Sequence, residues 1–285
     1  MKLVSFSLLD PPVGEGAIRP GFLSKNGDRV IDMSPSHYHS ALQLIQVGNT
    51  GELLDDALPS FPLDELRLHA PLLDPPRVFA IGLNYRDHAT ESGMTIPTTP
   101  VVFIKLVSAI IGPGEPIVLP KNSTQPDYEA EFAFVIGTGG YRISAESWRS
   151  HVYGYTIVND VSARDVQFSS TQWSMSKSFP TFCPLGPAIV TADQIADPHA
   201  LAIGLSINGE QLQNSNTREL VFGIPQLIEY LSSITPLQSG DIISTGTPPG
   251  VGLARKPPRW LKPGDTVKVT VEGLGDLVNP VVAEV

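Results

Sequence analysis

Residues 127–136 read DYEAEFAFVI, in which two glutamates lead directly into a continuous apolar run. The apolar segment 132–136 is typical of a strand buried in the core. On an extended chain, Glu129 and Glu131 project from the same face, where their charges repel each other unless a cation or solvent lies between them. The stretch therefore indicates a β-rich core with either a divalent metal site or a solvated strand face.

A third acidic residue follows another apolar segment. Residues 153–158 predict a second core strand, and Asp160 stands just after it, where ligand sites of β-rich folds often open. With Glu129 and Glu131 it supplies three hard oxygen donors that have no His or Cys beside them. Such a set suits Mg²⁺, Mn²⁺ or Ca²⁺ better than Zn²⁺, and Mg²⁺ would keep positions for water and a chelating substrate.

The overall composition agrees with a β-rich fold. Of the 285 residues, 41% are hydrophobic and 17% are charged, which is too apolar for a disordered chain. The 25 Gly and 27 Pro residues favour turns over long helices, so we expect an α+β fold that is mainly β. Proline-containing stretches at 59–62 and 71–76 predict a small β-containing N-terminal domain over 1–73 and a larger domain over 74–285.

Shorter patterns predict further strands. Residues 2–9 and the segment around 26–28 indicate short strands joined by a turn, because Asn-Gly readily adopts the positive φ angles of a tight hairpin. A strand over 201–207 runs into a second Asn-Gly pair at 208–209. Alternating valines over 267–271 predict another strand with one buried face.

Helices are expected in three places. Residues 222–232 give the clearest pattern, with Pro225 in the first turn and one apolar stripe formed by Ile224, Leu227, Ile228 and Leu231. A weaker apolar pattern covers 42–54. Residues 84–91 can also form a helix, on which His88 and Glu91 would share a face.

Charge and cysteine content exclude several classes of function. The formal net charge of −10 would repel phosphate backbones and anionic lipids, which argues against nucleic acid and membrane partners. The single cysteine, Cys183, cannot form an internal disulfide and is expected to be a small buried hydrophobe. No secretory signal and no membrane-spanning apolar run is present, so we expect a cytoplasmic protein.

Five motifs occur in a specific order over roughly residues 75–285. They are GLNYxDHxxE at 82–91, DYExE at 127–131, NDVSARDxQ at 159–167, KSFxTFCPLGP at 177–187 and STGTPxGVG at 244–252. Together they resemble the fumarylacetoacetate hydrolase family, and five ordered motifs are far more specific than any one of them. The resemblance implies that family's α+β, mainly β architecture, with a mixed β-sheet and β-roll in the C-terminal domain.

The resemblance also implies a set of site residues. The family's metal ligands correspond to Glu129, Glu131 and Asp160, the residues already singled out by their charge. The family's remaining site residues have three roles: substrate binding at Arg164, Gln167 and Thr247, enolate stabilisation at Lys177, and water activation by the pair His88 and Glu91.

The resulting expectation is a Mg²⁺-dependent hydrolase that cleaves the C–C bond of an acylpyruvate or related β-diketo acid. Mn²⁺ or Ca²⁺ could replace Mg²⁺. Oxaloacetate decarboxylation, 2-keto acid isomerisation or sugar-acid hydrolysis on the same metal are the alternatives, and a non-catalytic Ca²⁺-stabilised binding protein is a more distant one. The resemblance further implies a homodimer with a small keto acid as its ligand.

The chain departs from the family pattern at one point. The family usually has Phe-Asp-Thr-Phe after the motif lysine, whereas this chain has Pro180 in place of the aspartate. Proline fixes φ and removes both an amide donor and the acid. We therefore expect an altered loop at 179–182, with unchanged metal ligands.

Overall fold

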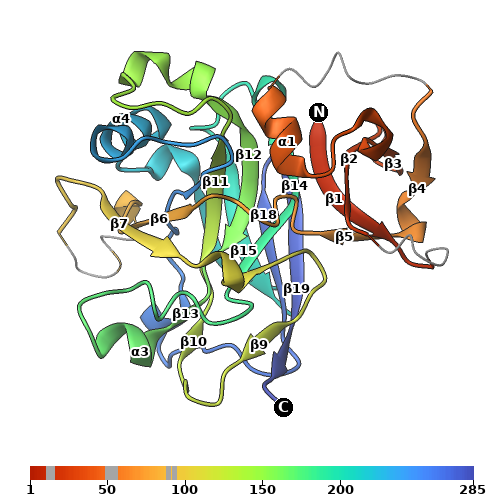
Figure 1. The fold of residues 1–285 in the computed structure, drawn as a ribbon. Coiled ribbons are helices and arrows are strands. Elements are labelled where there is room, and N and C mark those ends of the chain that lie inside the picture. The colour runs from red at the N-terminus through yellow and green to blue at the C-terminus, as the bar shows by residue number, and fades with distance from the viewer. Residues whose placement is uncertain (11–16, 49–56, 88–90, 92–94) are drawn as a thin grey trace.

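The computed structural model describes residues 1–10, 17–48, 57–87, 91 and 95–285 (Figure 1). The fold is α+β and mainly β, as the sequence predicts. The helices described with α-helical geometry are α1 (Ala41–Val47), α3 (Arg164–Phe168) and α4 (Ile224–Ile234). None of the described helices is long and apolar enough to cross a membrane.

The largest sheet contains twelve strands of mixed direction. Its main path runs in the order β4 (Ser60–Pro62), β3 (Arg29–Asp32), β2 (Arg19–Leu23), β1 (Lys2–Leu8), β14 (Cys183–Thr191), β12 (Val152–Asn159), β11 (Ala130–Ile136), β17 (Ile242–Ser244), β6 (Val78–Gly82) and β7 (Val101–Lys105). Off this path, β5 (Leu66–His69) pairs with β1, and β8 (Ile110–Ile111) pairs with β14.

Two smaller sheets complete the β-structure. The five-stranded sheet has the order β16 (Glu210–Asn216), β15 (Ala202–Ile207), β18 (Thr266–Val271), β19 (Gly275–Ala283) and β9 (Ile117–Leu119). A two-stranded sheet pairs β10 (Pro126–Asp127) with β13 (Ser162–Ala163).

Strand β11 is buried on both faces, which explains its continuous apolar sequence. Phe132, Phe134 and Ile136 on one face belong to a core that includes apolar residues of β15 and β18. Ala133 and Val135 on the other face belong to a second core, which includes apolar residues of α1. Each core receives alternate residues of β11, so this strand lies where the two cores meet.

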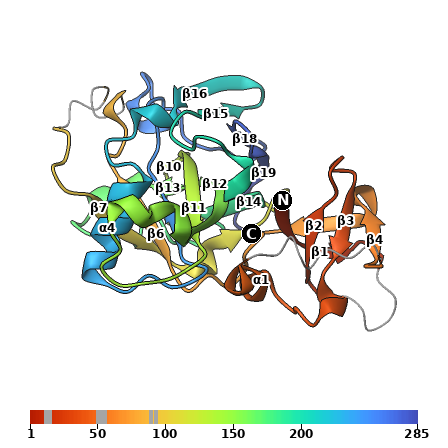
Figure 2. The ribbon, with the colours of Figure 1, turned by 90° about the horizontal axis from the view of Figure 1, so that it is seen from above.

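The N-terminal strands continue the large sheet. Antiparallel pairing of β1 with β14 places Lys2 opposite Val190 and Leu3 opposite Ile189. Leu3 and Ile189 also share the second core, which spans both parts of the chain. Seen from above, β1 to β4 lie to one side of the remaining structure (Figure 2). The domain boundary near residue 73 stays a prediction.

The predicted turns and the alternating strand are confirmed. Residues 24–28 connect β2 to β3, and Gly27 has a φ of 74°. Asn208 and Gly209 both adopt positive φ between β15 and β16. In β18 every second residue is buried, as the alternating valines indicate.

The helix predictions have different outcomes. Helix α4 has proline in its first turn and buries the whole predicted stripe, within two residues of the predicted bounds at each end. The helix predicted over 42–54 ends at Val47, and residues 49–56 lie outside the described part of the chain. Of the helix predicted over 84–91, residues 86, 87 and 91 are helical, and residues 88–90 lie outside the described part of the chain.

The buried stripe of α4 gives a stability prediction. Leu227→Ala is expected to lower the free energy of unfolding by about 2–5 kcal/mol, because Leu227 is fully buried in the first core. Equilibrium urea denaturation measures this change. The exposed Gln226 on the same helix gives the control Gln226→Ala, which should change the free energy by less than about 0.5 kcal/mol. Equal losses in both variants would contradict the prediction.

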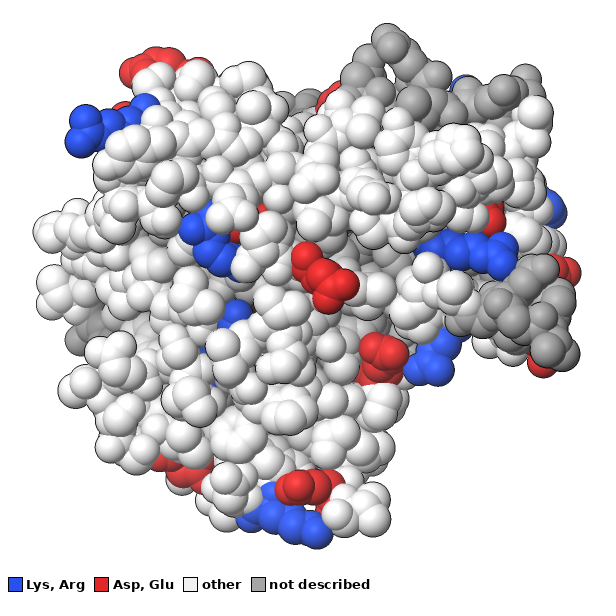
Figure 3. Space-filling model, viewed as in Figure 1, with Lys and Arg blue, Asp and Glu red and all other residues white. Residues whose placement is uncertain are grey.

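On the face seen in Figure 3, charged side chains are scattered among uncharged residues. The described Lys, Arg, Asp and Glu residues on that face occur singly or in mixed groups and form no large patch of one sign. Other charged residues are buried, and a group of them near the ends of β11 and β12 forms the candidate site.

Candidate active site

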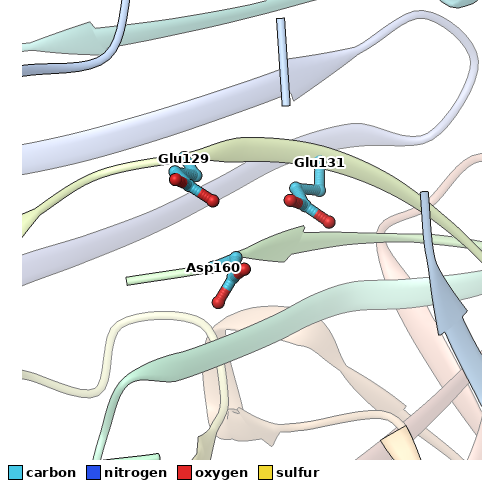
Figure 4. A group of neighbouring side chains, drawn as sticks. All are labelled: Glu129, Glu131 and Asp160. Carbon is cyan, nitrogen blue, oxygen red and sulfur yellow. The ribbon is translucent and has the colours of Figure 1, made fainter. Parts of the chain in front are cut away.

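Three carboxylates meet where β11 begins and β12 ends. Glu129 directly precedes β11, Glu131 lies within it, and Asp160 directly follows β12. The antiparallel register sets Ala130 opposite Asn159, and the Asp160 N–H donates to the Glu129 carbonyl oxygen at 2.9 Å. One carboxylate oxygen from each acid lies within 4.8 Å of the others, and all three side chains are buried (Figure 4).

Two buried lysines neutralise part of this charge. Lys177 Nζ donates to Glu129 Oε2 and to Asp160 Oδ2, both at 2.7 Å. Lys105, the last residue of β7, donates from Nζ to Asp160 Oδ1 at 2.5 Å and to the Lys177 carbonyl oxygen. Sequence reasoning missed Lys105, although a single lysine closing the apolar run VVFIK is a signal that could have marked it.

Arg164 at the start of α3 connects the carboxylates to two neighbouring segments. Its Nη2 donates to Glu129 Oε1 at 2.5 Å, its Nε to Asp127 Oδ2 at 2.8 Å, and its Nη1 to Gln167 Oε1 at 2.9 Å. Asp127 also accepts from the Gly252 N–H at 2.7 Å. Asp127 therefore holds both the guanidinium and the loop that follows β17.

Gln213 is a second residue that sequence reasoning missed, and its side-chain amide supports the site. Gln213 in β16 is buried, and its Oε1 accepts from the Ala130 N–H at 2.9 Å. Its Nε2 donates to Thr247 Oγ1, also at 2.9 Å. Gln213 thus fixes the start of β11 relative to Thr247, a residue that the family resemblance assigns to substrate binding.

Burial and neighbouring charges shift the pKa values in opposite directions. Burial raises the pKa of Glu129, but Lys177 and Arg164 lower it by more, so that it falls to about 2. Burial, together with Asp160 and Glu129, raises the pKa of Glu131 well above its usual range. For Lys177, burial lowers the pKa, and the attraction of Asp160 and Glu129 outweighs this and raises it. The ammonium therefore stays charged at neutral pH.

The donor chemistry fits a hard divalent cation. The described buried ionic groups at the site are four acids and three bases: Asp127, Glu129, Glu131 and Asp160 with Lys105, Arg164 and Lys177. This set has one acid more than it has bases, and the pKa of Glu131 is raised first by burial and then by the neighbouring charges of Asp160 and Glu129. Three converging carboxylates are the oxygen donors that Mg²⁺, Mn²⁺ and Ca²⁺ prefer.

A cavity of about 320 Å³ opens onto this cluster. The site residues predicted from the sequence that line it are Glu91, Glu129, Glu131, Arg164, Gln167, Lys177 and Thr247. Glu91 is exposed, and both of its carboxylate oxygens accept from the Gly250 N–H at 3.1 Å. His88 lies outside the described residues, so its predicted pairing with Glu91 stays a prediction.

The loop containing Pro180 lies away from the cavity lining. Pro180 is exposed, and the rings of Phe179 and Phe182 beside it pack with their centroids 5.2 Å apart. Thr181 adopts a positive φ of 72°, and its Oγ1 accepts from the Val118 N–H at 2.8 Å. Cys183 is buried, which raises its pKa to about 12 and agrees with its expected role as a small hydrophobe.

A family description and two curated proteins are similar to this chain over most of its length. Residues 77–282 match the family described as "Fumarylacetoacetate (FAA) hydrolase C-terminal". "Oxaloacetate tautomerase fahd2, mitochondrial" from Xenopus laevis is 42% identical, over 99% of this chain and 90% of that protein. "Oxaloacetate tautomerase FAHD2A, mitochondrial" from Bos taurus is 44% identical, over 92% of this chain and 87% of that protein.

Solved structures with the same fold cover the whole chain. A putative HpcE protein from Mycobacterium smegmatis is 37% identical, has a TM-score of 0.88 and is itself covered in full. A maleylpyruvate hydrolase from Sphingobium sp. SYK-6, solved with manganese(II) and pyruvate, is 29% identical, has a TM-score of 0.83 and is also covered in full. The chain is therefore a member of the fumarylacetoacetate hydrolase family of enzymes.

Proposed function

We propose that this protein is a divalent-metal-dependent tautomerase that interconverts the keto and enol forms of oxaloacetate or a related 2-keto acid. The observation that carries the proposal is the charged floor of the cavity, where the Lys177 ammonium lies 2.7 Å from both Glu129 and Asp160. Support also comes from the names of the two mitochondrial relatives, which are 42% and 44% identical. The cytoplasmic location and the homodimer expected from the sequence stay predictions.

In the proposed site, a bound cation and the protein side chains have different roles. A cation held by Glu129, Glu131 and Asp160 would polarise a chelated 2-keto acid and acidify the proton on its C3. Lys177, kept charged by its two carboxylate partners, stabilises the negative charge that develops on the enolate oxygen. Arg164 orients the substrate carboxylate, because a guanidinium presents a planar pair of donors to it.

Glu91 is the proposed proton carrier. It lines the cavity but stands apart from the buried carboxylate cluster, and its exposure lets solvent restore its protonation state. During ketonisation the enol hydroxyl loses its proton while C3 gains one, so the net change is one proton moved between two atoms of the substrate. A carboxylic acid in the cavity can deliver the proton to C3 and recover it from solvent.

Cleavage of the C–C bond of an acylpyruvate is the second candidate. It is favoured by the position of Glu91 in the cavity lining, since a carboxylate there can also activate water for attack on a distal carbonyl. The maleylpyruvate hydrolase from Sphingobium sp. SYK-6 is 29% identical over the whole chain. Both reactions need the same stabilised enolate, and they differ in whether water attacks.

One experiment separates the possible reactions. Chelator-treated protein is mixed with enol-oxaloacetate or acetylpyruvate in deuterated buffer, with and without added Mn²⁺ or Mg²⁺, and followed by enol absorbance and proton NMR. We expect metal-dependent loss of the oxaloacetate enol and deuterium exchange at C3, faster than with the metal in buffer alone. Pyruvate from oxaloacetate would indicate decarboxylation, and acetate plus pyruvate from acetylpyruvate would indicate hydrolysis. Enol decay no faster than the metal-only control would refute the tautomerase proposal.

A further inference from the structure

The cavity has two chemically different ends. Its floor carries the buried cations Arg164 and Lys177, which are 5% and 3% exposed. Away from the floor, the lining contains three aromatic side chains that we call the aromatic wall: Phe103, Phe168 and Trp173. None of the three belongs to the site residues predicted from the sequence.

The aromatic wall begins at the charged floor. Lys177 Nζ lies over the ring of Phe103, 5.1 Å from its centroid. The ring of Phe103 meets the indole of Trp173 edge to face, with centroids 5.7 Å apart and planes at 69°. Phe103 and Trp173 therefore form a contiguous aromatic surface beside the position proposed for the enolate, and Phe168 adds a third ring to the same cavity lining.

Packing fixes Trp173 in this wall. A Cβ atom built at Gly82, the last residue of β6, would lie 2.3 Å from Trp173 Cζ3, so the indole rests directly on the glycine backbone. Phe168 differs, because it ends α3 with 62% of its surface exposed while it lines the cavity. An apolar ligand covering Phe168 would remove this surface from water.

The charges around the cavity disfavour a second anionic group away from the floor. Arg164 and Lys177 are the cations found in its lining among the residues that the structure describes, and both lie at the floor. Glu91 in the lining is acidic, and the lining also includes the apolar residues Leu83, Val251 and Leu253. The second carboxylate of oxaloacetate would meet an acid and apolar side chains there, so we expect oxaloacetate to be accepted but to be less favoured than a keto acid whose distal group is apolar.

We infer that the preferred substrates are 2-keto acids with a flat apolar group at the far end, of which phenylpyruvate is the simplest example. The keto acid head would occupy the charged floor, and the aryl group would lie along the aromatic wall. The cavity volume of about 320 Å³ falls in the range of about 300–1,000 Å³ typical of small-molecule pockets. This inference rests on the proposed function, because it assigns the head group to the same floor.

Binding of two non-enolisable probes tests the inference without relying on turnover. Oxamate carries the keto-acid-like head alone, and N-phenyloxamate adds a phenyl ring. Isothermal titration of the Mn²⁺-loaded protein should give about 10- to 100-fold tighter binding of N-phenyloxamate, as expected for burial of one aromatic side group. Equal affinities for the two probes would overturn the inference.

Variants of the wall assign the preference to named residues. Phe168→Ala, at an exposed position that tolerates truncation, and Trp173→Leu should each reduce the ratio of the two affinities by about fivefold or more. Met175→Ala is the matched control, because Met175 is 69% exposed on the same loop as Trp173 and lies outside the cavity lining. An equal reduction in the Met175 variant would refute the role of the wall.

Kinetics then distinguish this inference from the proposed function. Enol-phenylpyruvate should ketonise with a higher kcat/KM than enol-oxaloacetate, and Phe168→Ala should reverse or remove that preference. Turnover of oxaloacetate without any preference for the aryl substrate would refute the inference and leave the tautomerase proposal intact. Tight binding of N-phenyloxamate without turnover of either enol would support the inference about the aromatic wall and refute the tautomerase proposal.

Discussion

Asp160→Asn is expected to lower kcat/KM for metal-dependent ketonisation by about 10²–10³-fold. The side chain accepts hydrogen bonds from both Lys105 and Lys177 and belongs to the three-carboxylate cluster. An amide has nearly the same shape but lacks the negative charge that both lysines and a bound cation need. Loss of this charge would weaken the cation site and leave two buried ammonium groups without full compensation.

Two measurements on the same variant separate its possible roles. Mn²⁺ titration should show weaker binding, and steady-state kinetics at saturating Mn²⁺ should still show reduced turnover. Asp74→Asn removes an exposed acid and should leave both quantities unchanged. Unchanged Mn²⁺ affinity in Asp160→Asn, with turnover lost, would contradict its proposed role as a metal ligand and leave it as the residue that positions Lys177.

Lys105→Met is expected to destabilise the fold by about 3–5 kcal/mol. Lys105 is 0% exposed and pairs with Asp160, which is also fully buried. Methionine fills a similar volume, so the main loss is the positive charge beside a buried carboxylate and not the packing. The free energy of unfolding in urea, measured on chelator-treated protein, tests this prediction.

A matched variant and a double variant sharpen the test. Lys121→Met replaces an exposed lysine and should change the stability by less than about 0.5 kcal/mol. The double variant Lys105→Met/Asp160→Asn should lose less stability than the sum of the losses in the two single variants, because each change removes the partner of the other. Fully additive losses would show that Lys105 and Asp160 have no interaction energy with each other.

Local sequence patterns were sufficient for several of the strands and for part of the site. The apolar run after Glu131 predicts β11 because a strand with both faces covered needs no alternation. The spacing of Glu129 and Glu131 predicts one shared face, and the end of the next apolar segment marks Asp160. These inferences depend only on neighbours in the chain and on charge repulsion.

The remaining features depend on contacts between distant segments. Lys105 reaches Asp160 across 55 residues of sequence, and Gln213 reaches Ala130 across 83. Periodicity identifies which face of a strand is buried, but it does not identify the strand that will lie against it. The aromatic wall escaped notice for the same reason, since Phe103 and Trp173 come from separate segments.

The pairing of β1 with β14 also limits how the chain can be divided. A fragment beginning near residue 74 would leave Ile189 and Val190 of β14 without their hydrogen-bonding neighbour and would uncover apolar side chains of the shared core. Exposed strand edges of this kind recruit other chains and promote aggregation. The N-terminal strands thus cover the β14 edge and protect the rest of the chain from aggregation through that edge, whatever substrate it accepts.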